Sequence, residues 1–304
     1  MAPNNVTTVL LLGFQNVHSF RILIFLLILV VYCVTTSGNV LIIALVSCSK
    51  NIRSPMYFLL SQLSVSDLLL SSDITPNLLH VLLNDTGTIS LPGCISQFYF
   101  FGSSEISECF LLTAMSYDRY LAICKPLYYN SLMSHGFCLK LIIISWLLSF
   151  SIMLAEALKI YKLHFCGPRV INHFFCDFYP LLELSCSDVS RVKREVTLLC
   201  IPVIICPFAI IMVSYAYIVF TILSISSLPG RQKAFSTCSS HLTVVTIFYG
   251  TLIGMYVIPT RGKSLSAGKV LSMLYTVVTP FLNPIIYSLR NKDIRKAIKK
   301  TFGI

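Results

Sequence analysis

Seven stretches of the sequence are apolar over the length needed to cross a lipid bilayer. A hydrocarbon core of roughly 30 Å requires about 20 helical residues. Only helices and closed barrels satisfy their own backbone groups in lipid, and these stretches are continuously apolar rather than alternating. The sequence therefore predicts an all-α membrane protein, a bundle of seven transmembrane helices. The predicted spans are residues 21–47, 55–82, 94–123, 136–158, 196–223, 234–259 and 268–289.

The composition agrees with a membrane protein. Hydrophobic residues make up 56% of the 304 residues and charged residues 12%. A soluble domain carries roughly 25% charged residues, so this chain has too little polarity to coat a globule in water. The net charge of +11 lies in short segments between the apolar stretches. This pattern is typical of membrane topology and does not indicate nucleic acid as a partner.

The distribution of charge predicts how the chain crosses the plasma membrane. We expect one seven-transmembrane domain over residues 1–304, with 1–20 extracellular, 21–289 in the bundle and 290–304 cytoplasmic. In this orientation 13 of the 23 Lys and Arg residues are cytoplasmic, as the positive-inside rule requires. Two glycosylation acceptor motifs, at Asn5 and Asn84, would then face the outside.

The tail after the seventh stretch has its apolar residues near one helical face. Ile294, Ala297, Ile298 and Phe302 lie on that face, and Lys and Arg lie on the other. This predicts a short amphipathic C-terminal helix on the anionic lipids of the inner leaflet. A solvated basic tail is the alternative.

Four of the twelve cysteines lie outside the membrane in this topology: Cys94, Cys166, Cys176 and Cys186. An even number of cysteines in an oxidising compartment favours two disulfides. Four cysteines allow three pairings, and the spacing alone does not choose among them.

Acidic residues inside predicted spans are candidates for function, because ionisable groups in a bilayer are costly. Asp67 lies within the second span, and Glu105 and Glu108 share one face of the third. Asp67 and Glu108 could remain protonated, share a proton, or bind a sodium ion with Asn39 and Asn283. No other cofactor is indicated. Glu105 lies nearer the outer side and would either face a ligand cavity or remain a buried protonated acid.

Two further groups suit a conformational switch. Asp118 and Arg119 end the third span as an adjacent ion pair, whose breaking would free Arg119 for a new partner. Asn283-Pro284 and Tyr287 combine a helix kink, an interior amide and a phenol one turn further on. Pro202, Pro207 and Pro280 also lie within spans, where each should bend its helix.

These features, in this order, resemble a rhodopsin-like G-protein-coupled receptor, and longer strings resemble the vertebrate odorant receptor branch. The resemblance covers roughly residues 13–298. The strings are Pro55-Met56-Tyr57-Phe58, Met115-Ser116-Tyr117-Asp118-Arg119-Tyr120, Lys233-Ala234-Phe235-Ser236-Thr237-Cys238 and Pro280-Phe281-Leu282-Asn283-Pro284-Ile285-Ile286-Tyr287.

The resemblance implies a small-molecule odorant as ligand, a stimulatory (olfactory-type) heterotrimeric G protein as partner, and a rise in cyclic AMP. It implies that Cys94 pairs with Cys176 and Cys166 with Cys186. The implied activation switch comprises Asp118, Arg119, Tyr120, Tyr215, His241, Asn283, Pro284 and Tyr287. The implied pocket is lined by Phe101, Gly102, Glu105, Ile106, Met153, Leu199, Val203, Tyr249, Leu252, Ile253, Tyr256 and Thr276.

Two departures from related receptors bear on the ligand. Glu105 is not part of the family's usual pattern, so we expect it to influence ligand choice. Phe101 stands where amine receptors place an aspartate, which argues against a conventional amine site. A rhodopsin-like receptor for a metabolite remains the alternative. A transporter is a distant one, because no internal repeat stands out. No catalytic constellation indicates an enzyme.

Overall fold

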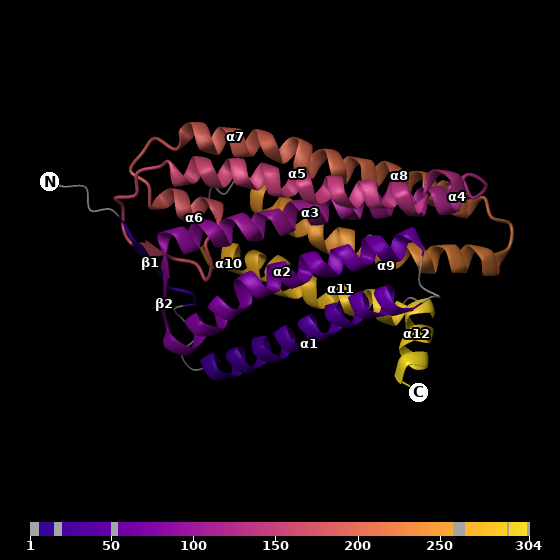
Figure 1. The fold of residues 1–304 in the computed structure, drawn as a ribbon, viewed down its shortest axis with the longest axis horizontal. Coiled ribbons are helices and arrows are strands. Elements are labelled where there is room, and N and C mark those ends of the chain that lie inside the picture. Colours follow the sequence, from indigo (N-terminus) through magenta and orange to yellow (C-terminus); the bar gives the residue numbers. More distant parts are fainter. Residues whose placement is uncertain (1–5, 15–19, 50–53, 258–264, 291, 303–304) are drawn as a thin grey trace.

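The computed structural model describes residues 6–14, 20–49, 54–257, 265–290 and 292–302 (Figure 1). Within this part the chain is mostly helical. Five helical runs are long and apolar enough to cross a membrane, which makes this a multi-pass membrane protein. They are Arg21–Cys48, His135–Tyr161, Ser190–Leu223, Cys238–Tyr256 and Gly268–Ser288.

The long helices lie side by side along the length of the molecule (Figure 1). The first four are α1 (Arg21–Cys48), α2 (Pro55–Asn84), α3 (Leu91–Cys124) and α5 (His135–Tyr161). Three composite runs follow: α7 (Ser190–Cys200), η2 (Ile201–Ile205) and α8 (Cys206–Leu223); α9 (Leu228–Leu252) and η3 (Ile253–Val257); and α10 (Leu265–Met273), η4 (Leu274–Val278) and α11 (Thr279–Arg290). Shorter helices are α4 (Tyr129–Leu132), α6 (Phe178–Glu183) and α12 (Lys292–Phe302).

Local sequence explains where several helices begin. Ser90 caps α3 by accepting a hydrogen bond from the Gly93 amide at 3.1 Å, and Ser134 caps α5 through the Phe137 amide at 3.3 Å. Such caps satisfy amides that lack a partner within the helix. Pro55 begins α2, where its missing N–H costs nothing.

Three helical runs contain a π-helical segment, and each segment has a proline in it or shortly after it. Pro202 lies within η2, and Pro280 follows η4. A widened π turn, a feature frequent at functional sites, therefore accompanies Pro202 and Pro280, whereas Pro207 lies in the first turn of α8 and Pro284 within the α-helical α11.

The expectation of an all-α chain was incomplete, because the structure contains a small sheet. Its strands β1 (Thr8–Leu11), β2 (Gly87–Ser90) and β3 (Val170–Ile171) lie in the order β2-β1-β3. β1 pairs antiparallel with β2 and parallel with β3. Strands of four residues or fewer carry too little periodicity to stand out in the sequence. We call this end of the molecule the sheet end, and the end with α4 and α12 the opposite end (Figure 1).

Four helical runs begin three or more residues earlier than predicted, at Leu91, Ser190, Leu228 and Leu265 rather than at residues 94, 196, 234 and 268. The added turns are more polar than the spans, so hydropathy alone did not include them. In α7, exposed Arg191 bonds to Glu195 at 2.8 Å, and Lys159 of α5 contacts Glu195 at 2.9 Å. These ion pairs hold the polar extension of α7 beside α5.

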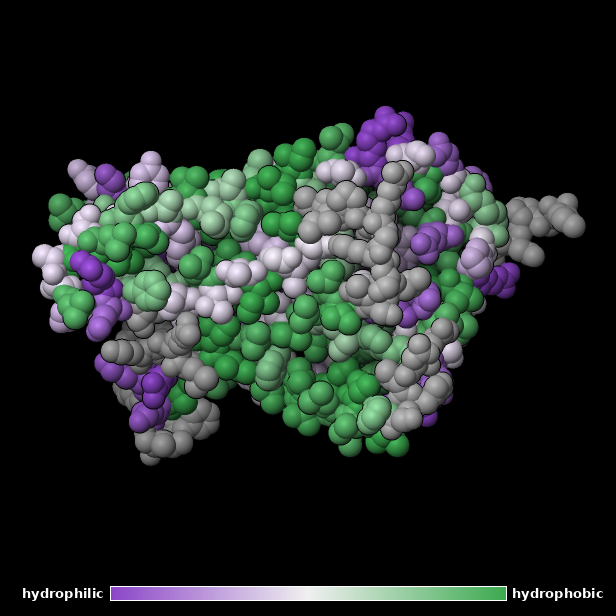
Figure 2. All heavy atoms as spheres, turned by 180° about the vertical axis from the view of Figure 1, so that it is seen from behind, coloured by the Kyte–Doolittle hydropathy of each residue, from purple (hydrophilic) through white to green (hydrophobic). Residues whose placement is uncertain are grey.

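The surface has the distribution expected of a membrane protein. In Figure 2 hydrophobic residues cover much of the middle of the visible face, and strongly hydrophilic residues gather toward the two ends. Leu23, Leu27 and Leu147 are among the large apolar side chains exposed on α1 and α5. Their exposure is consistent with contact to lipid.

The C-terminal helix α12 has two distinct faces within its described side chains. Ile294 and Ile298 line a groove with residues of α1 and α11, whereas Arg295, Lys296 and Lys299 are exposed. The side chain of Phe302 lies outside the described part. The helix therefore joins the bundle by an apolar face and presents a basic one.

Candidate functional site

A small cavity lies near the sheet end, between α3, α5, α6, the α7–η2 run and η3. Its volume is about 80 Å³. Fifteen described residues line it, and most are apolar. They are Phe98, Phe101, Gly102, Glu105, Ile106, Met153, Glu156, Asp177, Phe178, Val196, Leu199, Cys200, Val203, Ile204 and Tyr256.

Eight of the twelve residues expected in a pocket line this cavity: Phe101, Gly102, Glu105, Ile106, Met153, Leu199, Val203 and Tyr256. Tyr249, Leu252, Ile253 and Thr276 do not. The Tyr249 hydroxyl donates to the carbonyl of Cys109 at 3.2 Å, and its ring packs on Phe208 at 5.2 Å. Thr276 donates to the Ser272 carbonyl at 2.7 Å. Both side chains are buried elsewhere in the bundle.

Some of the lining residues that the sequence did not predict come from segments whose position a span pattern does not fix, whereas Phe98 and Ile204 lie inside predicted spans, where hydropathy does not tell one face from another. Asp177 and Phe178 belong to the loop between α5 and α7, and Val196 and Cys200 to the turns around the expected start of the fifth span. Glu156 did carry a signal, since it is an acid near the end of an apolar span.

A glycine determines how close α3 comes to α5 at the cavity. A Cβ atom at Gly102 would overlap the side chain of Met153. Glycine therefore lets Met153 lie directly against α3. Methionine is unbranched and flexible, so this wall of the cavity can adapt its shape.

Three carboxyl groups reach the same cavity. Glu105 Oε1 and Glu156 Oε2 are buried and have no hydrogen-bond partner among the described residues. The other oxygen of Glu156 accepts from Lys159 at 2.8 Å. Asp177 Oδ1 accepts from the Phe178 amide at 2.7 Å and from the Tyr256 hydroxyl at 3.0 Å. Burial raises the pKa of Asp177 to about 6, against the lowering effect of those two bonds.

The loop between α5 and α7 covers the cavity and is tied to α3. The structure contains the Cys94–Cys176 disulfide, and a second one, Cys166–Cys186, closes the loop on itself. Gln97 adds a polar clamp: its side chain accepts from the Cys176 amide at 2.9 Å and donates to the Asp73 carbonyl at 2.9 Å. The roof of the cavity is thus fixed covalently and by hydrogen bonds.

The N-terminal segment lies over this loop and is fastened to α10. Lys269 Nζ donates to the Gly13 carbonyl at 2.5 Å and to Asn172 Oδ1 at 2.7 Å. The ring of His173 lies next to the Ser272 hydroxyl, with Nε2 at 3.2 Å, and packs against Phe174 at 4.6 Å. Burial and the positive charge of Lys269 lower the pKa of His173 to about 3.

A polar cluster occupies the interior of the bundle beyond the cavity. Asn283 Nδ2 lies 3.0 Å from each carboxyl oxygen of Asp67. Asn39, expected beside them, donates instead to the carbonyls of Thr35 at 3.1 Å and Pro280 at 3.3 Å. Asn39 Oδ1 and Glu108 Oε1 are buried acceptors without a partner in the described part of the chain. Such oxygens fit a hard cation or a proton, so the donor set is compatible with sodium.

At the opposite end, Asp118 has two partners. Arg119 Nη2 contacts Asp118 Oδ2 at 2.5 Å, and the Tyr129 hydroxyl donates to Asp118 Oδ1 at 2.7 Å. Burial and the neighbouring carboxylate raise the pKa of Tyr129. Asp118 is fully buried, so this ion pair is shielded from water. We call the Asp118–Arg119 ion pair, together with its hydrogen bond from Tyr129, the latch, and this structure has it closed.

The other expected switch residues lie around the same end. Tyr215 is 2.7 Å from His241 Nδ1, which joins α8 to α9. Tyr120 packs edge-on against Tyr217 with ring centroids 6.0 Å apart. The hydroxyl of Tyr287 is buried without a partner among the described residues, so it is available for a new bond.

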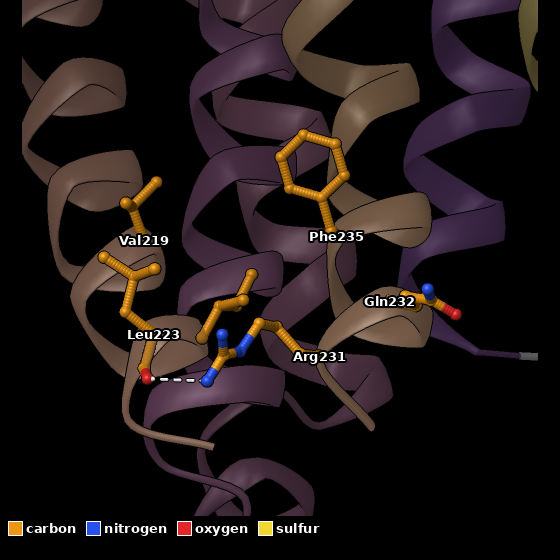
Figure 3. Close-up of a pocket in the computed structure, with 6 residues that line it drawn as sticks. Val219, Leu223, Arg231, Gln232 and Phe235 are labelled. Carbon is orange, nitrogen blue, oxygen red and sulfur yellow. Dashed lines mark hydrogen bonds between the residues drawn. The ribbon is translucent and has the colours of Figure 1, made fainter. Parts of the chain in front are cut away.

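A second cavity, of about 340 Å³, opens between the ends of α8 and α9. Figure 3 shows Arg231 reaching from α9 to the backbone at the end of α8. Its Nη2 donates to the carbonyls of Leu223 at 3.3 Å and Ile225 at 3.1 Å. Val219, Leu223 and Phe235 are exposed, so this cavity opens on the outside of the bundle.

One of the two glycosylation motifs, at Asn84, lies in the described part of the chain. Asn84 is exposed at the last residue of α2, with its amide donating to the His80 carbonyl at 3.0 Å. Asn5 lies outside the described residues.

Comparison with known proteins gives one consistent result. The family described as "Olfactory receptor" matches residues 28–303. Human olfactory receptor 11L1 is 47% identical over 303 residues, which are 99% of this chain and 94% of that protein. Mouse olfactory receptor 5P76 is 47% identical over 97% of this chain and 94% of its own length. Rat olfactory receptor 287 is 47% identical over 96% and 94%.

Proposed function

The chain belongs to the olfactory receptor family, a family of odorant-sensing G-protein-coupled receptors and not of enzymes, and from this we propose how the receptor acts. We propose that a small odorant binds in the cavity near the sheet end and favours one arrangement of the bundle. That arrangement admits a stimulatory, olfactory-type heterotrimeric G protein at the opposite end, and cyclic AMP rises. The observation that carries the proposal is an apolar cavity with a few convergent polar groups, joined by α3 to a buried Asp118–Arg119 latch.

The same proposal places the receptor in the plasma membrane with seven spans. α2 and α3 have 30 and 34 residues and pack among the five apolar runs, so we assign them as the remaining spans. Residues 1–20 would be extracellular, 21–289 the bundle and 290–304 cytoplasmic. The basic face of α12 would then lie on anionic lipids, and Asn5 and Asn84 would be available for glycosylation.

The odorant shifts the equilibrium only by the difference in its affinity for the two arrangements. A 100-fold difference corresponds to about 2.7 kcal/mol, enough to change the balance of a receptor that rests near its switching point. Glu105 and Arg119 are 14 positions apart on α3. At about 1.5 Å per residue the signal must therefore travel roughly 20 Å.

The interior cluster lies along that path. We propose that Asp67 and Glu108, with Asn39 and Asn283, hold either protons or a sodium ion in the resting receptor. Asn283 and Pro284 are on α11, so movement of this helix would rearrange the cluster. After the latch opens, Arg119 would donate hydrogen bonds to new acceptors. The unpartnered hydroxyl of Tyr287 and the Tyr215–His241 pair are the groups that we propose for this role.

The test is a cyclic-AMP assay in cells that express the receptor with an olfactory G protein, over a panel of amines, acids, alcohols, ketones and aromatics. Arg119→Ala should abolish every response at unchanged surface expression. Arg194→Ala, which removes an exposed arginine at the sheet end that does not line the cavity, is the control and should respond normally. Full signalling by Arg119→Ala would contradict the proposed switch.

A further inference from the structure

The carboxyl groups of the cavity have no matching positive charge in its wall. Glu105, Glu156 and Asp177 come from three different elements, α3, α5 and the start of α6, and all three line a cavity of about 80 Å³. None of the described lining residues is a lysine, arginine or histidine. Lys159, a cation close to the cavity, is already divided between Glu156 and Glu195.

Two of these carboxyl groups each have one oxygen without a hydrogen-bond partner among the described residues. Glu156 is only 6% exposed, and its Oε2 has no partner among the described residues. Glu105 Oε1 is in the same condition. Buried acceptors are nearly always hydrogen bonded, and leaving one unsatisfied costs about 1–3 kcal/mol, more for a charged group. The wall of the cavity therefore presents acceptors and lacks donors to satisfy them.

The third carboxyl group is held in a fixed orientation. Asp177 caps α6 and accepts from Tyr256 of η3 at 3.0 Å. It therefore connects the roof of the cavity to the run that ends in η3. A ligand that bonds to the carboxyl groups touches α3, α5 and this connection together.

The rest of the wall selects for a compact apolar body. Phe98, Phe101, Leu199, Val203 and Ile204 present only carbon. An apolar cavity of roughly 150 Å³ accommodates benzene, so the smaller volume found here suits a short branched chain. A ring requires Met153 to move.

We propose that this receptor is tuned to small organic cations, namely protonated primary or secondary alkylamines with a compact branched body. The ammonium group donates to the free oxygens of Glu105 and Glu156, and the alkyl group fills the aromatic and aliphatic side of the cavity. This inference rests on the proposed function, since it names the ligand class of the same site. It does not need an aspartate at position 101, because the carboxyl groups come from one turn deeper in α3 and from α5.

The probes are three compounds with one carbon skeleton: 3-methylbutan-1-amine, 3-methylbutan-1-ol and 3-methylbutanoic acid. Their binding to the purified full-length receptor is measured as the ligand-induced rise in melting temperature. The amine should stabilise the receptor at concentrations at least tenfold below those of the alcohol, and the acid should have no effect. Equal or better stabilisation by the alcohol or the acid overturns the proposal.

Glu105→Gln keeps the size of the side chain and removes its charge. This variant should bind the amine at least tenfold more weakly than the unaltered receptor does. Its binding of the alcohol should stay within about threefold of the unaltered receptor. Glu183→Gln is the matched control, an exposed glutamate at the same end that does not line the cavity, and it should match the unaltered receptor. If the amine stabilises both Glu105→Gln and Glu156→Gln as strongly as the unaltered receptor, the proposal is also overturned. If a variant fails to fold, the comparison of the three probes on the unaltered receptor still decides.

The cyclic-AMP assay of the same three probes separates this inference from the proposed function. Amine binding without a cyclic-AMP response supports the cationic ligand and contradicts the coupling. A cyclic-AMP response to the alcohol, lost in Arg119→Ala, with no effect of the amine, supports the coupling and contradicts the cationic ligand.

Discussion

Tyr129 is the residue that distinguishes the latch in this structure from a simple adjacent ion pair. It lies on the short helix α4 and donates its hydroxyl to the oxygen of Asp118 that Arg119 leaves free. Hydrogen bonds to charged groups contribute about 1.5–3 kcal/mol. The closed latch is therefore stabilised from two sides.

Tyr129→Phe should raise signalling in the absence of odorant. Loss of the bond weakens the closed arrangement, and about 1.4 kcal/mol shifts the equilibrium tenfold. Basal cyclic AMP, corrected for surface expression, measures the change, and we expect an increase of several-fold. Tyr128→Phe alters an exposed neighbour and serves as control. Basal activity that stays at the control level would show that Tyr129 does not hold the latch.

The predictability of individual residues depends on whether their neighbours lie on the same helix. The Asp118–Arg119 pair could be predicted from adjacency, whereas the face of the third span left Glu105 either in a cavity or buried as a protonated acid. Asp177 could not, because its role depends on Tyr256, far along the chain. Asn39 is on the expected helix, yet the structure turns its amide to the Pro280 carbonyl. Pro280 lies 241 positions away in the sequence, and no sequence pattern specifies this contact.

At the scale of elements, the loop between α5 and α7 combines two titratable groups with opposite effects. His173 is kept neutral by burial and by Lys269, with a pKa of about 3 against an ordinary 6.5. An unfolded loop takes up its proton near pH 6.5, so acidification favours the unfolded loop and costs about 2 kcal/mol by pH 5. Asp177 has a raised pKa, about 6 against 3.8. Its burial is therefore less unfavourable at low pH, and this offsets about 1 kcal/mol.

His173→Gln should reverse the pH response of this loop. The melting temperature of the purified receptor is compared at pH 7.5 and pH 5, and the quantity of interest is the difference between variants. The unaltered receptor should lose more stability on acidification than His173→Gln, in which only the stabilising protonation of Asp177 remains. His164→Gln, an exposed histidine of the same loop, should behave like the unaltered receptor. If His173→Gln loses as much melting temperature between pH 7.5 and pH 5 as the unaltered receptor, His173 is not the cause of that loss.

Elements were predicted well where a single long periodic or apolar stretch defines them, as for α1 and α5. The sheet was missed because β1 satisfies its backbone groups with partners from β2 and β3, far away in the sequence. The start of α7 was placed late because its first turns are polar and are stabilised by Lys159 and Arg191 through Glu195. Both errors concern contacts between distant segments.

At the scale of the whole molecule, charge and the two ends of the bundle define an orientation. An epitope at the N-terminus should be labelled on intact cells, and one at the C-terminus only after permeabilisation. The reason is the excess of Lys and Arg at the end that carries α12. Asn5→Gln combined with Asn84→Gln should abolish a mass shift caused by a peptide N-glycosidase. Labelling of the C-terminal epitope on intact cells would reverse the assigned topology.

The position of β1 in the middle of the sheet has a consequence for biosynthesis. β1 ends at Leu11 and leaves the ribosome well before β3, which begins at Val170. At about 5–20 residues per second, its second neighbour appears roughly 10 to 30 s later. In the proposed topology, β1 lies in the lumen during that interval with β2 as its only partner strand in the sheet. A nascent receptor whose fourth span fails to insert would keep the other edge of β1 open, where a chaperone could recognise it as a mark of incomplete assembly.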